Sequence, residues 1–436
     1  MFCYTSGTTG VPKAAMIAEE GLLSFTQAMD LHPGLTPEEI GANDVHLSYL
    51  PLAHIFERLV YLLFFTRGVE IGFYNGDPTR LKDDLQALRP TFFAGVPRVY
   101  NRFADLIKAN LAKITGAKKK LVDAAFETKL DNLKNKGSYT HALYDKIVMN
   151  KMKDVVGGRM KIMITGAAPL SAEIGDFLKC AFCCPIIEVY GASEGTAFTL
   201  STPENYLSGN VGGPLANSEI KVEDVPEMNY LSTDKDEYGR STPRGEICVR
   251  GPSILKGYYK EVEKTKEALD KDGWYHTGDI GVFLSNGALK IVDRKKNIFK
   301  LSQGEYVAPE KTENFYLLSK YITESFVYGD SFHSACIVFM VPDKDNLIEL
   351  AKEQKIEFDT YENLCKNPKI TQLVLDDCNA IGKKNELKGF ELAKKAYLEP
   401  VSFLLQGLTT PSMKLKRPIA KDRYKNEIVE MYKGIN

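Results

Sequence analysis

A short stretch near the start of the chain has the composition of a phosphate-binding loop. It reads TSGTTGVPK over residues 5–13. Its two glycines let the backbone approach a ligand closely. Its hydroxyl groups, backbone N–H groups and one lysine suit a polyphosphate. The stretch favours nucleotide binding over a bare surface loop, and the residues concerned are Thr5, Ser6, Gly7, Thr8, Thr9, Gly10 and Lys13.

This stretch differs from the loop of P-loop NTPases. That loop needs the spacing G-x-x-x-x-G-K-[ST] at the opening of a helix. Here Val11 and Pro12 separate the second glycine from Lys13, and alanine follows the lysine. The spacing therefore excludes the P-loop NTPase kind of site.

Three of the eight cysteines cluster in the segment CAFCC, at Cys180, Cys183 and Cys184. The C-x-x-C spacing suits a metal or a redox pair, but no second cysteine or histidine pair stands at ligand spacing. Free thiols at a buried helix end are the favoured interpretation. Reduced thiols suit an intracellular compartment.

Short apolar runs that end in Gly, Pro or Asn alternate with helical stretches through much of the chain. The runs predict strands, and the alternation predicts an α/β fold with a largely parallel sheet. Ligands bind at the carboxyl ends of the strands in such sheets. The predicted strands are residues 45–52, 69–75, 90–97, 160–166 and 185–191.

The amino-acid composition changes after these strands. Residues 210–298 are rich in glycine and turn dipeptides, which predicts β-hairpins, one of them with a two-residue turn at Asn286–Gly287. Further along, residues 325–341 predict a pair of strands and residues 346–395 predict helices.

Polar residues from Asp293 onward mark a domain boundary. They follow the apolar segment LKIV, and the chain then resumes as a compact α+β unit. The expected organisation is a large α/β domain with parallel-type sheets and a distorted β-rich subdomain over residues 1–292. A small α+β domain over residues 293–436 follows it.

The charge balance excludes bulk nucleic-acid binding. The chain has 56 Lys and Arg against 57 Asp and Glu, whereas a nucleic-acid partner requires a basic face. No apolar run reaches the length of a membrane span. The lysine run at 118–120 favours a solvated helix face over contact with an anionic membrane surface, since acidic residues are interspersed.

The motifs together resemble those of the adenylate-forming (AMP-binding) superfamily, which includes acyl-CoA synthetases, aryl ligases, luciferases and nonribosomal adenylation domains. The first stretch is similar to the phosphate-binding signature of that superfamily. Five further motifs follow in the family's order and span nearly the whole chain: ITGAAPL (164–170), VYGASEGT (189–196), DGWYHTGDIG (272–281), GALKIVDRKKNIFKLSQGEYVAPE (287–310) and PSMKLKRP (411–418).

Other segments resemble the eukaryotic long-chain fatty acyl-CoA synthetases. They are SYLPLAHIFER (48–58), TFFAGVPRVYNRF (91–103) and Met413–Lys414, where many superfamily members carry Gly-Lys. The resemblance implies that ATP and a fatty acid give an acyl-adenylate and pyrophosphate, and that CoA then displaces AMP. A medium-chain or aryl acid ligase, or an inactive fragment that binds nucleotide or acyl chains, is the alternative.

The resemblance implies three residues for the first half reaction, which needs charge neutralisation by metal and lysine. Glu194 would bind Mg²⁺, with Thr5 near the same phosphates. Lys414 would bridge the substrate carboxylate and the α-phosphate once the small domain has closed as a lid. A helix N-terminal charge is the alternative for Glu194, and a solvated run of lysines is the alternative for Lys414.

The resemblance also implies a nucleotide site. Tyr190 would cover the adenine, although core packing is equally compatible with this position. Asp279 would accept hydrogen bonds from both ribose hydroxyls, and Arg294 would reach the ribose or phosphates, with a surface ion pair as the alternative. The other implied nucleotide-site residues are Gly166, Ala167, Ala168, Glu188, Gly191 and Ser193.

Three further residues complete the implied site. His54 lies where the family lines its acyl pocket, and a core histidine is equally compatible. Asp293 would be the hinge of the mobile lid domain. Gly304 would let the pantetheine arm of CoA pass close to the backbone.

We expect Mg²⁺ as cofactor, fatty acid, ATP and CoA as partners, and no nucleic acid. Members of the family carry a substantial segment before the phosphate loop. We therefore expect that this chain lacks its N-terminal part, exposes apolar surface on the large domain and has little activity. Membrane association, peripheral or anchored, would use that segment. The full-length protein is expected inside the cell, on the cytoplasmic side of the endoplasmic reticulum or another organelle membrane.

Overall fold

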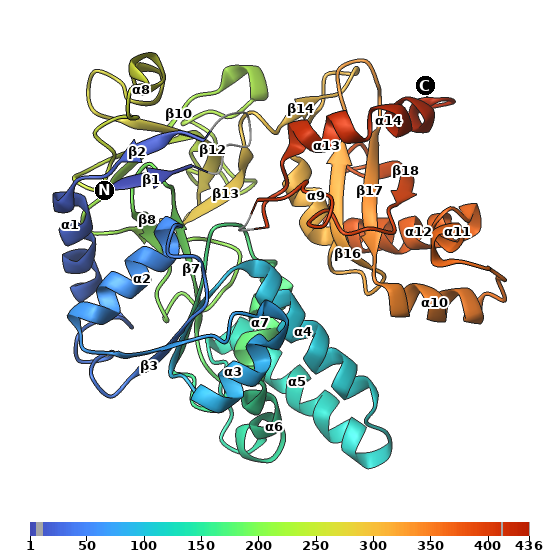
Figure 1. The fold of residues 1–436 in the computed structure, drawn as a ribbon, viewed down its shortest axis with the longest axis horizontal. Helices are drawn as coiled ribbons and strands as arrows, with labels where there is room; N and C mark the ends of the chain where they lie inside the picture. Colours follow the sequence, from blue (N-terminus) through green and yellow to red (C-terminus); the bar gives the residue numbers. More distant parts are fainter. Residues whose placement is uncertain (6–11, 411–412, 436) are drawn as a thin grey trace. The chain divides into compact units, whose positions relative to one another are not determined.

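The computed structural model describes residues 1–5, 12–410 and 413–435. The chain divides into two compact units (Figure 1). The first unit holds Met1–Thr5, Pro12–Thr277 and Gly281–Ile291, and the second holds Gly278–Ile280 and the chain from Val292 onward.

A seven-stranded sheet forms the centre of the first unit, in the order β4-β3-β5-β6-β7-β8-β9 among the described residues. The strands from β4 to β7 are parallel, and β8 and β9 add antiparallel pairs. The predicted α/β fold with a largely parallel sheet is confirmed. The strands are β3 (Val45–Ser48), β4 (Glu70–Phe73), β5 (Phe92–Gly95), β6 (Ile162–Thr165), β7 (Ile186–Gly191), β8 (Ala197–Leu200) and β9 (Gly213–Pro214).

Helices cover both faces of this sheet. Phe92 and Phe93 are neighbours on β5, so their side chains point to opposite faces. Phe92 packs edge-on against Phe64 with ring centroids 4.4 Å apart, and Phe93 packs against Phe103 at 5.8 Å. Figure 1 shows the two groups, α1 with α2 and α4 with α5 and α7. The helices are α1 (Glu19–Asp30), α2 (Ile55–Thr66), α3 (Leu81–Leu88), α4 (Pro97–Ala112), α5 (Gly116–Lys136), α6 (Asn150–Lys153) and α7 (Ala172–Phe182).

The structure also contains smaller sheets, and the four-stranded one lies in the glycine-rich region where the sequence predicts β-hairpins. An antiparallel hairpin pairs β1 with β2, and a four-stranded sheet has the order β10-β11-β12-β13 among the described residues. These elements are β1 (Phe2–Tyr4), β2 (Ala14–Met16), β10 (Glu219–Glu223), β11 (Arg244–Arg250), α8 (Val262–Ala268), β12 (Tyr275–Phe283) and β13 (Leu289–Arg294).

A three-residue loop joins β12 to β13, so the predicted two-residue turn is wrong. The Leu284 N–H donates to the Ala288 carbonyl at 2.8 Å, and the Gly287 N–H donates to the Leu284 carbonyl at 2.9 Å. Gly287 has φ +84°, the left-handed conformation that follows a type I turn in such loops. The pairing of Leu284 with Ala288 therefore places Ser285 in the loop with Asn286 and Gly287.

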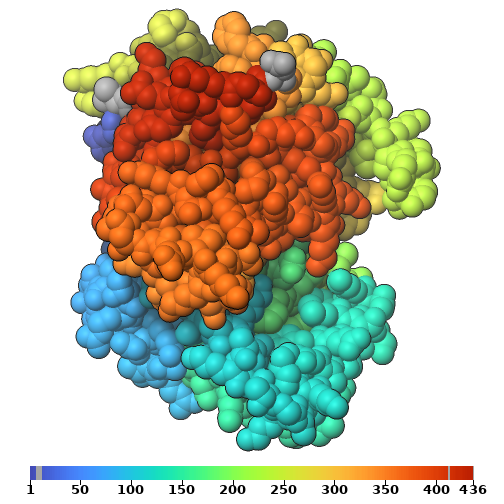
Figure 2. Space-filling model, turned by 90° about the vertical axis from the view of Figure 1, so that its right-hand side faces the viewer, coloured from blue at the N-terminus to red at the C-terminus, as the bar shows by residue number. Residues whose placement is uncertain are grey.

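The second unit is built on a three-stranded sheet in the order β16-β17-β18 among the described residues. Strands β16 and β17 form the predicted pair, and they are antiparallel. The side chains of this unit, orange to red in Figure 2, pack into one continuous body. Its elements are β14 (Phe299–Lys300), β15 (Tyr306–Val307), α9 (Pro309–Tyr316), β16 (Ile322–Tyr328), β17 (Cys336–Pro342), α10 (Lys344–Glu353), α11 (Tyr361–Cys365), α12 (Pro368–Lys384), β18 (Ala393–Leu398), α13 (Arg417–Arg423) and α14 (Lys425–Tyr432).

The helical region predicted through residue 395 ends earlier. Helix α12 stops at Lys384, and β18 begins at Ala393 and pairs in parallel with β17. The segment AKKAYL has the composition of a helix. Pairing along the fully buried β17 overrides that local preference, as tertiary context commonly does. Among the described residues, no helix combines the length and the apolar character that a bilayer crossing requires.

Candidate functional site

The hairpin of β1 and β2 holds the two ends of the first predicted motif together. The Thr5 N–H donates to the Lys13 carbonyl at 2.8 Å, and the Lys13 N–H donates to Thr5 Oγ1 at 3.3 Å. The predicted phosphate-site residues between them, Ser6, Gly7, Thr8, Thr9 and Gly10, lie outside the described residues.

Tyr258 links this hairpin to Glu194. The Lys13 ammonium lies over the Tyr258 ring, 4.7 Å from its centroid, and the Tyr258 hydroxyl donates to Glu194 Oε1 at 2.8 Å. Burial and the Glu194 carboxylate raise the pKa of Tyr258, so its hydroxyl stays protonated and donates. Sequence reasoning missed Tyr258, because it lies in a segment that is read only as a hairpin.

The chain around Tyr258 also fixes the backbone of the Glu194 loop. The Leu255 N–H donates to the Glu194 carbonyl at 2.7 Å, and the Met16 N–H donates to the Gly257 carbonyl at 2.9 Å. The partly buried Glu194 carboxylate is a hard oxygen ligand of the kind that Mg²⁺ takes together with phosphate oxygens and waters. The Glu194 carboxylate is therefore a suitable ligand for the Mg²⁺ that the sequence implies.

The small residues at the strand ends are sterically required. A Cβ on Gly166 would lie 2.4 Å from Val189 Cγ1, and a Cβ on Gly191 would lie 2.2 Å from the Thr196 carbonyl oxygen. Since β6 and β7 are adjacent and parallel, their carboxyl ends meet at one edge of the sheet.

Backbone conformation marks the same edge. Ala167, directly after Gly166, has φ +69°, which is uncommon for a residue other than glycine. Strain of this kind concentrates at functional sites. Ala168 follows it and is exposed, and Ser193 is partly buried in the loop that carries Glu194.

Tyr190 is buried at the end of β7. Its ring packs edge-on against Phe198, with centroids 5.6 Å apart and an interplanar angle of 72°. This contact is the core packing that the sequence also allows for Tyr190, in addition to a contact with adenine.

Glu188 is a buried carboxylate held by backbone. One of its oxygens accepts the Gly209 N–H at 2.6 Å. Burial raises the pKa of Glu188 to about 7, and the hydrogen bond from Gly209 offsets this only in part. Glu188 therefore lies on the core side of its strand, with its charge shielded from water.

We expect Glu188→Gln to flatten the dependence of stability on pH. The native protein holds the Glu188 proton more tightly than the unfolded chain, so wild-type stability falls as pH rises from the ordinary pKa of 4.5 towards 7. Above this window the variant should be more stable by about 3 kcal/mol, and near pH 4 it should gain nothing. Urea unfolding at several pH values measures the difference. The exposed Glu204→Gln is the control, and an equal pH response of both variants would contradict the assignment.

Asp279 and Arg294 lie together in the second unit. Arg294 Nε is 3.5 Å from Asp279 Oδ1, and the two side chains are 33% and 14% exposed. The partly buried pair brings a carboxylate from the middle of β12 next to a guanidinium at the end of β13.

Asp293 is a buried junction between β13 and α9. Its two carboxylate oxygens accept the Arg294 N–H at 2.6 Å and the Glu310 N–H at 2.9 Å. Burial, with the Glu310 charge nearby, raises its pKa well above the ordinary range of a carboxyl. A substitution here would remove the contact that joins the end of β13 to the start of α9.

The remaining predicted residues of the second unit lie on two turns. Lys414 belongs to a turn in which its N–H donates to Thr410 Oγ1 at 3.0 Å and its carbonyl accepts the Thr410 N–H at 2.8 Å. Met413, just before it, has φ +62°. Gly304 has φ +96° at the exposed turn between β14 and β15, where glycine is the residue that adopts this conformation readily.

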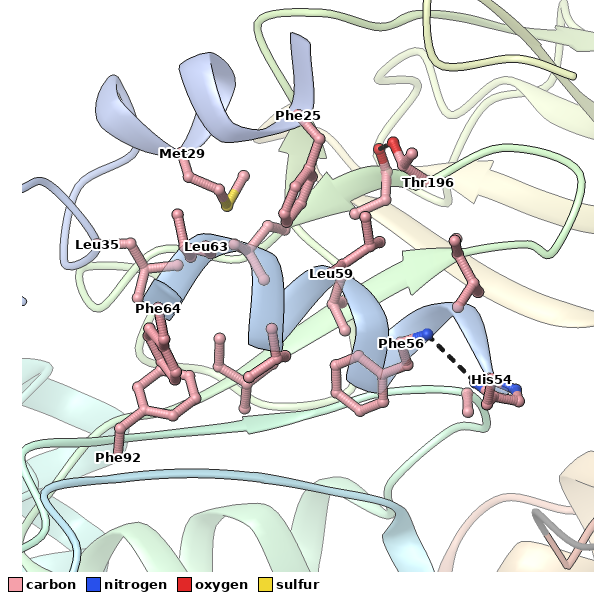
Figure 3. Close-up of a pocket in the computed structure, with 18 residues that line it drawn as sticks. Phe25, Met29, Leu35, His54, Phe56, Leu59, Leu63, Phe64, Phe92 and Thr196 are labelled. Carbon is pink, nitrogen blue, oxygen red and sulfur yellow. Dashed lines mark hydrogen bonds between the residues drawn. The ribbon is translucent and has the colours of Figure 1, made fainter. Parts of the chain in front are cut away.

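An apolar cavity opens beside the strand ends of the first unit (Figure 3). Its empty volume is about 650 Å³, part of it open to solvent, but only about 60 Å³ admits the centre of a water molecule. The cavity is therefore narrow. Ala167, Gly191 and Thr196 line it together with one face of α2.

His54 and Phe64 lie towards opposite ends of this cavity, and α2 runs between them (Figure 3). At a rise of about 1.5 Å per residue, that span is about 15 Å. His54 also caps α2, since its Nδ1 accepts the Phe56 N–H at 3.2 Å. It thus makes a structural contact and also lines the cavity.

The sequence is similar to several known acyl-CoA synthetases. It is 45% identical to the peroxisomal long chain acyl-CoA synthetase 6 of Arabidopsis thaliana and 44% identical to the long-chain-fatty-acid–CoA ligase 5 of Mus musculus. These matches cover 99% and 100% of this chain but only 60% and 62% of those proteins. The chain thus spans about three fifths of the length of these relatives.

The fold matches a solved adenylation domain. The adenylation domain of the carboxylate reductase from Mycobacterium chelonae aligns with a TM-score of 0.79 at 28% identity, over 99% of this chain and 59% of that one. The AMP-binding enzyme family matches residues 1–259, which is more than half of the sequence. This chain, with its strand-end glycines, its Glu194 loop and its apolar cavity, belongs to the AMP-binding enzyme family.

Proposed function

We propose that this protein activates long-chain fatty acids in two steps. In the first, a fatty-acid carboxylate attacks the α-phosphate of ATP, which gives an acyl-adenylate and releases pyrophosphate. In the second, the thiol of CoA attacks the acyl carbon, which gives the thioester and releases AMP. Family membership and the names of the relatives support this reaction.

The apolar cavity supports the substrate class best. Its lining is almost entirely aliphatic and aromatic, and it follows α2 for about 15 Å from His54 to Phe64. A narrow slot of this kind matches an extended polymethylene chain better than a wide ring. Ala167 and Gly191 line it, at the strand ends where the activated carboxylate would lie.

Residues of both units would share the first step. Thr5 and Lys13 would hold phosphate oxygens, and Glu194 would hold Mg²⁺, with Tyr258 fixing the carboxylate. Bound magnesium would neutralise charge on the phosphates. Lys414 would approach the α-phosphate and the substrate carboxylate, where its positive charge would stabilise the transition state.

The other predicted residues take supporting roles in this proposal. Tyr190 and the strand-end residues would hold the adenine, and Asp279 with Arg294 would hold the ribose and phosphates. Residues 293–436 would move as a lid about Asp293, and Gly304 would then lie beside CoA. The buried junction at Asp293 and the left-handed Gly304 support these assignments.

Substrate profiling tests the proposal. The protein is mixed with ATP, Mg²⁺ and a series of acids, pyrophosphate release is measured, and the thioester is identified by mass spectrometry after addition of CoA. Long saturated acids should give the highest kcat/KM. A preference for benzoate-type acids would point to an aryl ligase. ATP binding without pyrophosphate release from any acid would point to a binding protein without turnover.

Leu63→Trp tests where the acyl chain lies. Leu63 is 4% exposed near the Phe64 end of the cavity, so the larger side chain should block a long chain but admit a short one. We expect kcat/KM to fall roughly 10- to 100-fold for a long acid and to change little for hexanoate. Retained hexanoate activity shows that the variant is folded. Phe65→Trp, on the exposed face of α2, is the matched control, and equal loss for both acids would contradict the placement.

The partners and location follow from the same proposal. Fatty acid, ATP and CoA are the proposed partners. We propose an intracellular location. Because long-chain acids partition into membranes, we also propose peripheral or anchored contact with the endoplasmic reticulum or another organelle membrane. One relative is peroxisomal by name, and the eight unpaired cysteines suit a reducing environment.

A further inference from the structure

A mixed cluster of cysteine, histidine and carboxylate side chains lies on the sheet of β10, β11 and β12. Glu223 pairs with Glu246 across β10 and β11, and Cys248 lies two residues beyond Glu246 on the same face. His276 reaches the cluster from β12. Three strands distant in sequence thus bring these groups together, and none of them has a part in the proposed reaction.

The ligand atoms stand at distances suited to one small cation. Cys248 Sγ is 3.5 Å from His276 Nδ1 and 3.7 Å from Glu223 Oε2, and these last two atoms are 4.0 Å apart. Zinc ligands lie about 2.0–2.3 Å from the ion, which at tetrahedral angles puts them about 3.3–3.6 Å from one another. A shift of a few tenths of an ångström would therefore close the site around an ion.

Further carboxylates complete the surroundings. Glu246 Oε1 lies 4.0 Å from His276 Nδ1, at the edge of the cluster. Asp270 Oδ2 lies 3.7 Å from His276 Nε2, on the other side of the ring. Histidine ligands usually donate their second ring N–H to such a carboxylate, which fixes the tautomer that binds metal.

Without a cation the cluster concentrates negative groups around a buried thiol. Burial and the Glu246 and Glu223 carboxylates raise the pKa of Cys248 to about 12. A divalent ion at this position would favour the thiolate and neutralise the carboxylates together. The mixture of sulfur, nitrogen and oxygen donors suits a borderline-soft ion such as Zn²⁺ better than Mg²⁺ or Ca²⁺.

One cation of the protein already competes for this position. Lys221 Nζ is 3.7 Å from Glu223 Oε2 and lies over the Trp274 ring, 4.8 Å from its centroid. The Lys221 side chain is 41% exposed, so it can turn out to solvent when an ion binds. Its removal should therefore strengthen metal binding.

We propose that Glu223, Cys248 and His276 form a Zn²⁺-type site with three protein ligands, and that Glu246 lies close beside it. The bound ion would tie β10, β11 and β12 together, three residues before Asp279 on β12. The site is separate from the Mg²⁺ that the reaction uses, and it does not depend on the proposed function.

Cobalt titration of the reduced protein tests the site. Co²⁺ replaces Zn²⁺ and gives a sulfur-to-metal charge-transfer band in the near ultraviolet only when a thiolate binds it. We expect one equivalent of Co²⁺ to produce this band, and added Zn²⁺ to abolish it. Cys248→Ser should remove the band. Cys336→Ser, another buried strand cysteine, should keep it and is the matched control.

Two exposed positions keep the test valid if Cys248→Ser does not fold. Glu223→Gln should weaken Co²⁺ binding at least about tenfold, as loss of a ligand does, and Lys221→Met should tighten it severalfold. Three results would overturn the assignment: no stoichiometric binding by the wild-type protein, Co²⁺ binding without a sulfur band, or a band that survives in Cys248→Ser.

Discussion

Lys414→Ala is expected to slow pyrophosphate release by about 10²- to 10³-fold, the loss that follows removal of one preorganised electrostatic contact to a transition state. The lysine ammonium would act on charge that develops between the carboxylate and the α-phosphate. ATP binding measured without acid should change little, because the contact is made mainly in the transition state. Single-turnover pyrophosphate release at saturating ATP and acid measures the effect.

Nearby lysines provide the control for Lys414. Lys416 lies two residues further along, and its ammonium donates to the Gly407 carbonyl at 3.2 Å. Lys416→Ala removes the same charge from the same segment and should leave the rate within about twofold, since exposed charge contacts contribute little. Equal losses in the two variants would mean that the basic tail acts through its total charge, and would refute the assignment of Lys414.

Glu194→Gln should be the second most damaging substitution. The amide keeps the size of the side chain and accepts the Tyr258 hydrogen bond, but it carries no charge to hold Mg²⁺. We expect pyrophosphate release to fall by about 10²-fold or more, and the Mg²⁺ concentration for half-maximal rate to rise. A magnesium titration of the initial rate reports both quantities.

Tyr258→Phe separates the carboxylate from its support. This variant keeps the Glu194 charge but loses the 2.8 Å hydrogen bond to it and the hydrogen bond with Tyr275. A hydrogen bond to a charged group contributes about 1.5 kcal/mol or more, so we expect a loss of roughly tenfold in rate. The Mg²⁺ requirement should stay near that of the wild type. If Tyr258→Phe proved as damaging as Glu194→Gln, or if Glu194→Gln kept its magnesium dependence, Glu194 would be a structural residue of its loop.

Much of the fold follows from local pattern. The apolar runs around Phe92, Met163 and Ile187 predict buried parallel strands, and the structure contains them as β5, β6 and β7. These strands can be predicted because a strand buried on both faces must be apolar at consecutive positions. The ends of helices and strands are harder to predict. Strand β3 stops at Ser48 although the sequence predicts a strand to residue 52, and Pro51 within that run could not donate to a neighbouring strand.

The predictions from sequence are wrong where pairing between strands decides the backbone conformation. The Asn286–Gly287 dipeptide favours a two-residue turn, yet the pairing of Leu284 with Ala288 makes the loop one residue longer. The segment from Ala393 has helical composition, yet it pairs with β17 and forms strand β18. Both outcomes depend on a partner strand, which no local window contains.

The sequence by itself determined the family, the order of its motifs and the α/β class, because these features lie in contiguous residues with fixed chemistry. Only the tertiary structure decided which side chains meet. It set Tyr258 between Lys13 and Glu194, left Ala167 in a strained conformation, and brought Cys248 to within 3.5 Å of His276. The physical reason is that strand pairing and packing bring together residues that are far apart in the chain. Their spacing in the sequence does not show how close they lie in space.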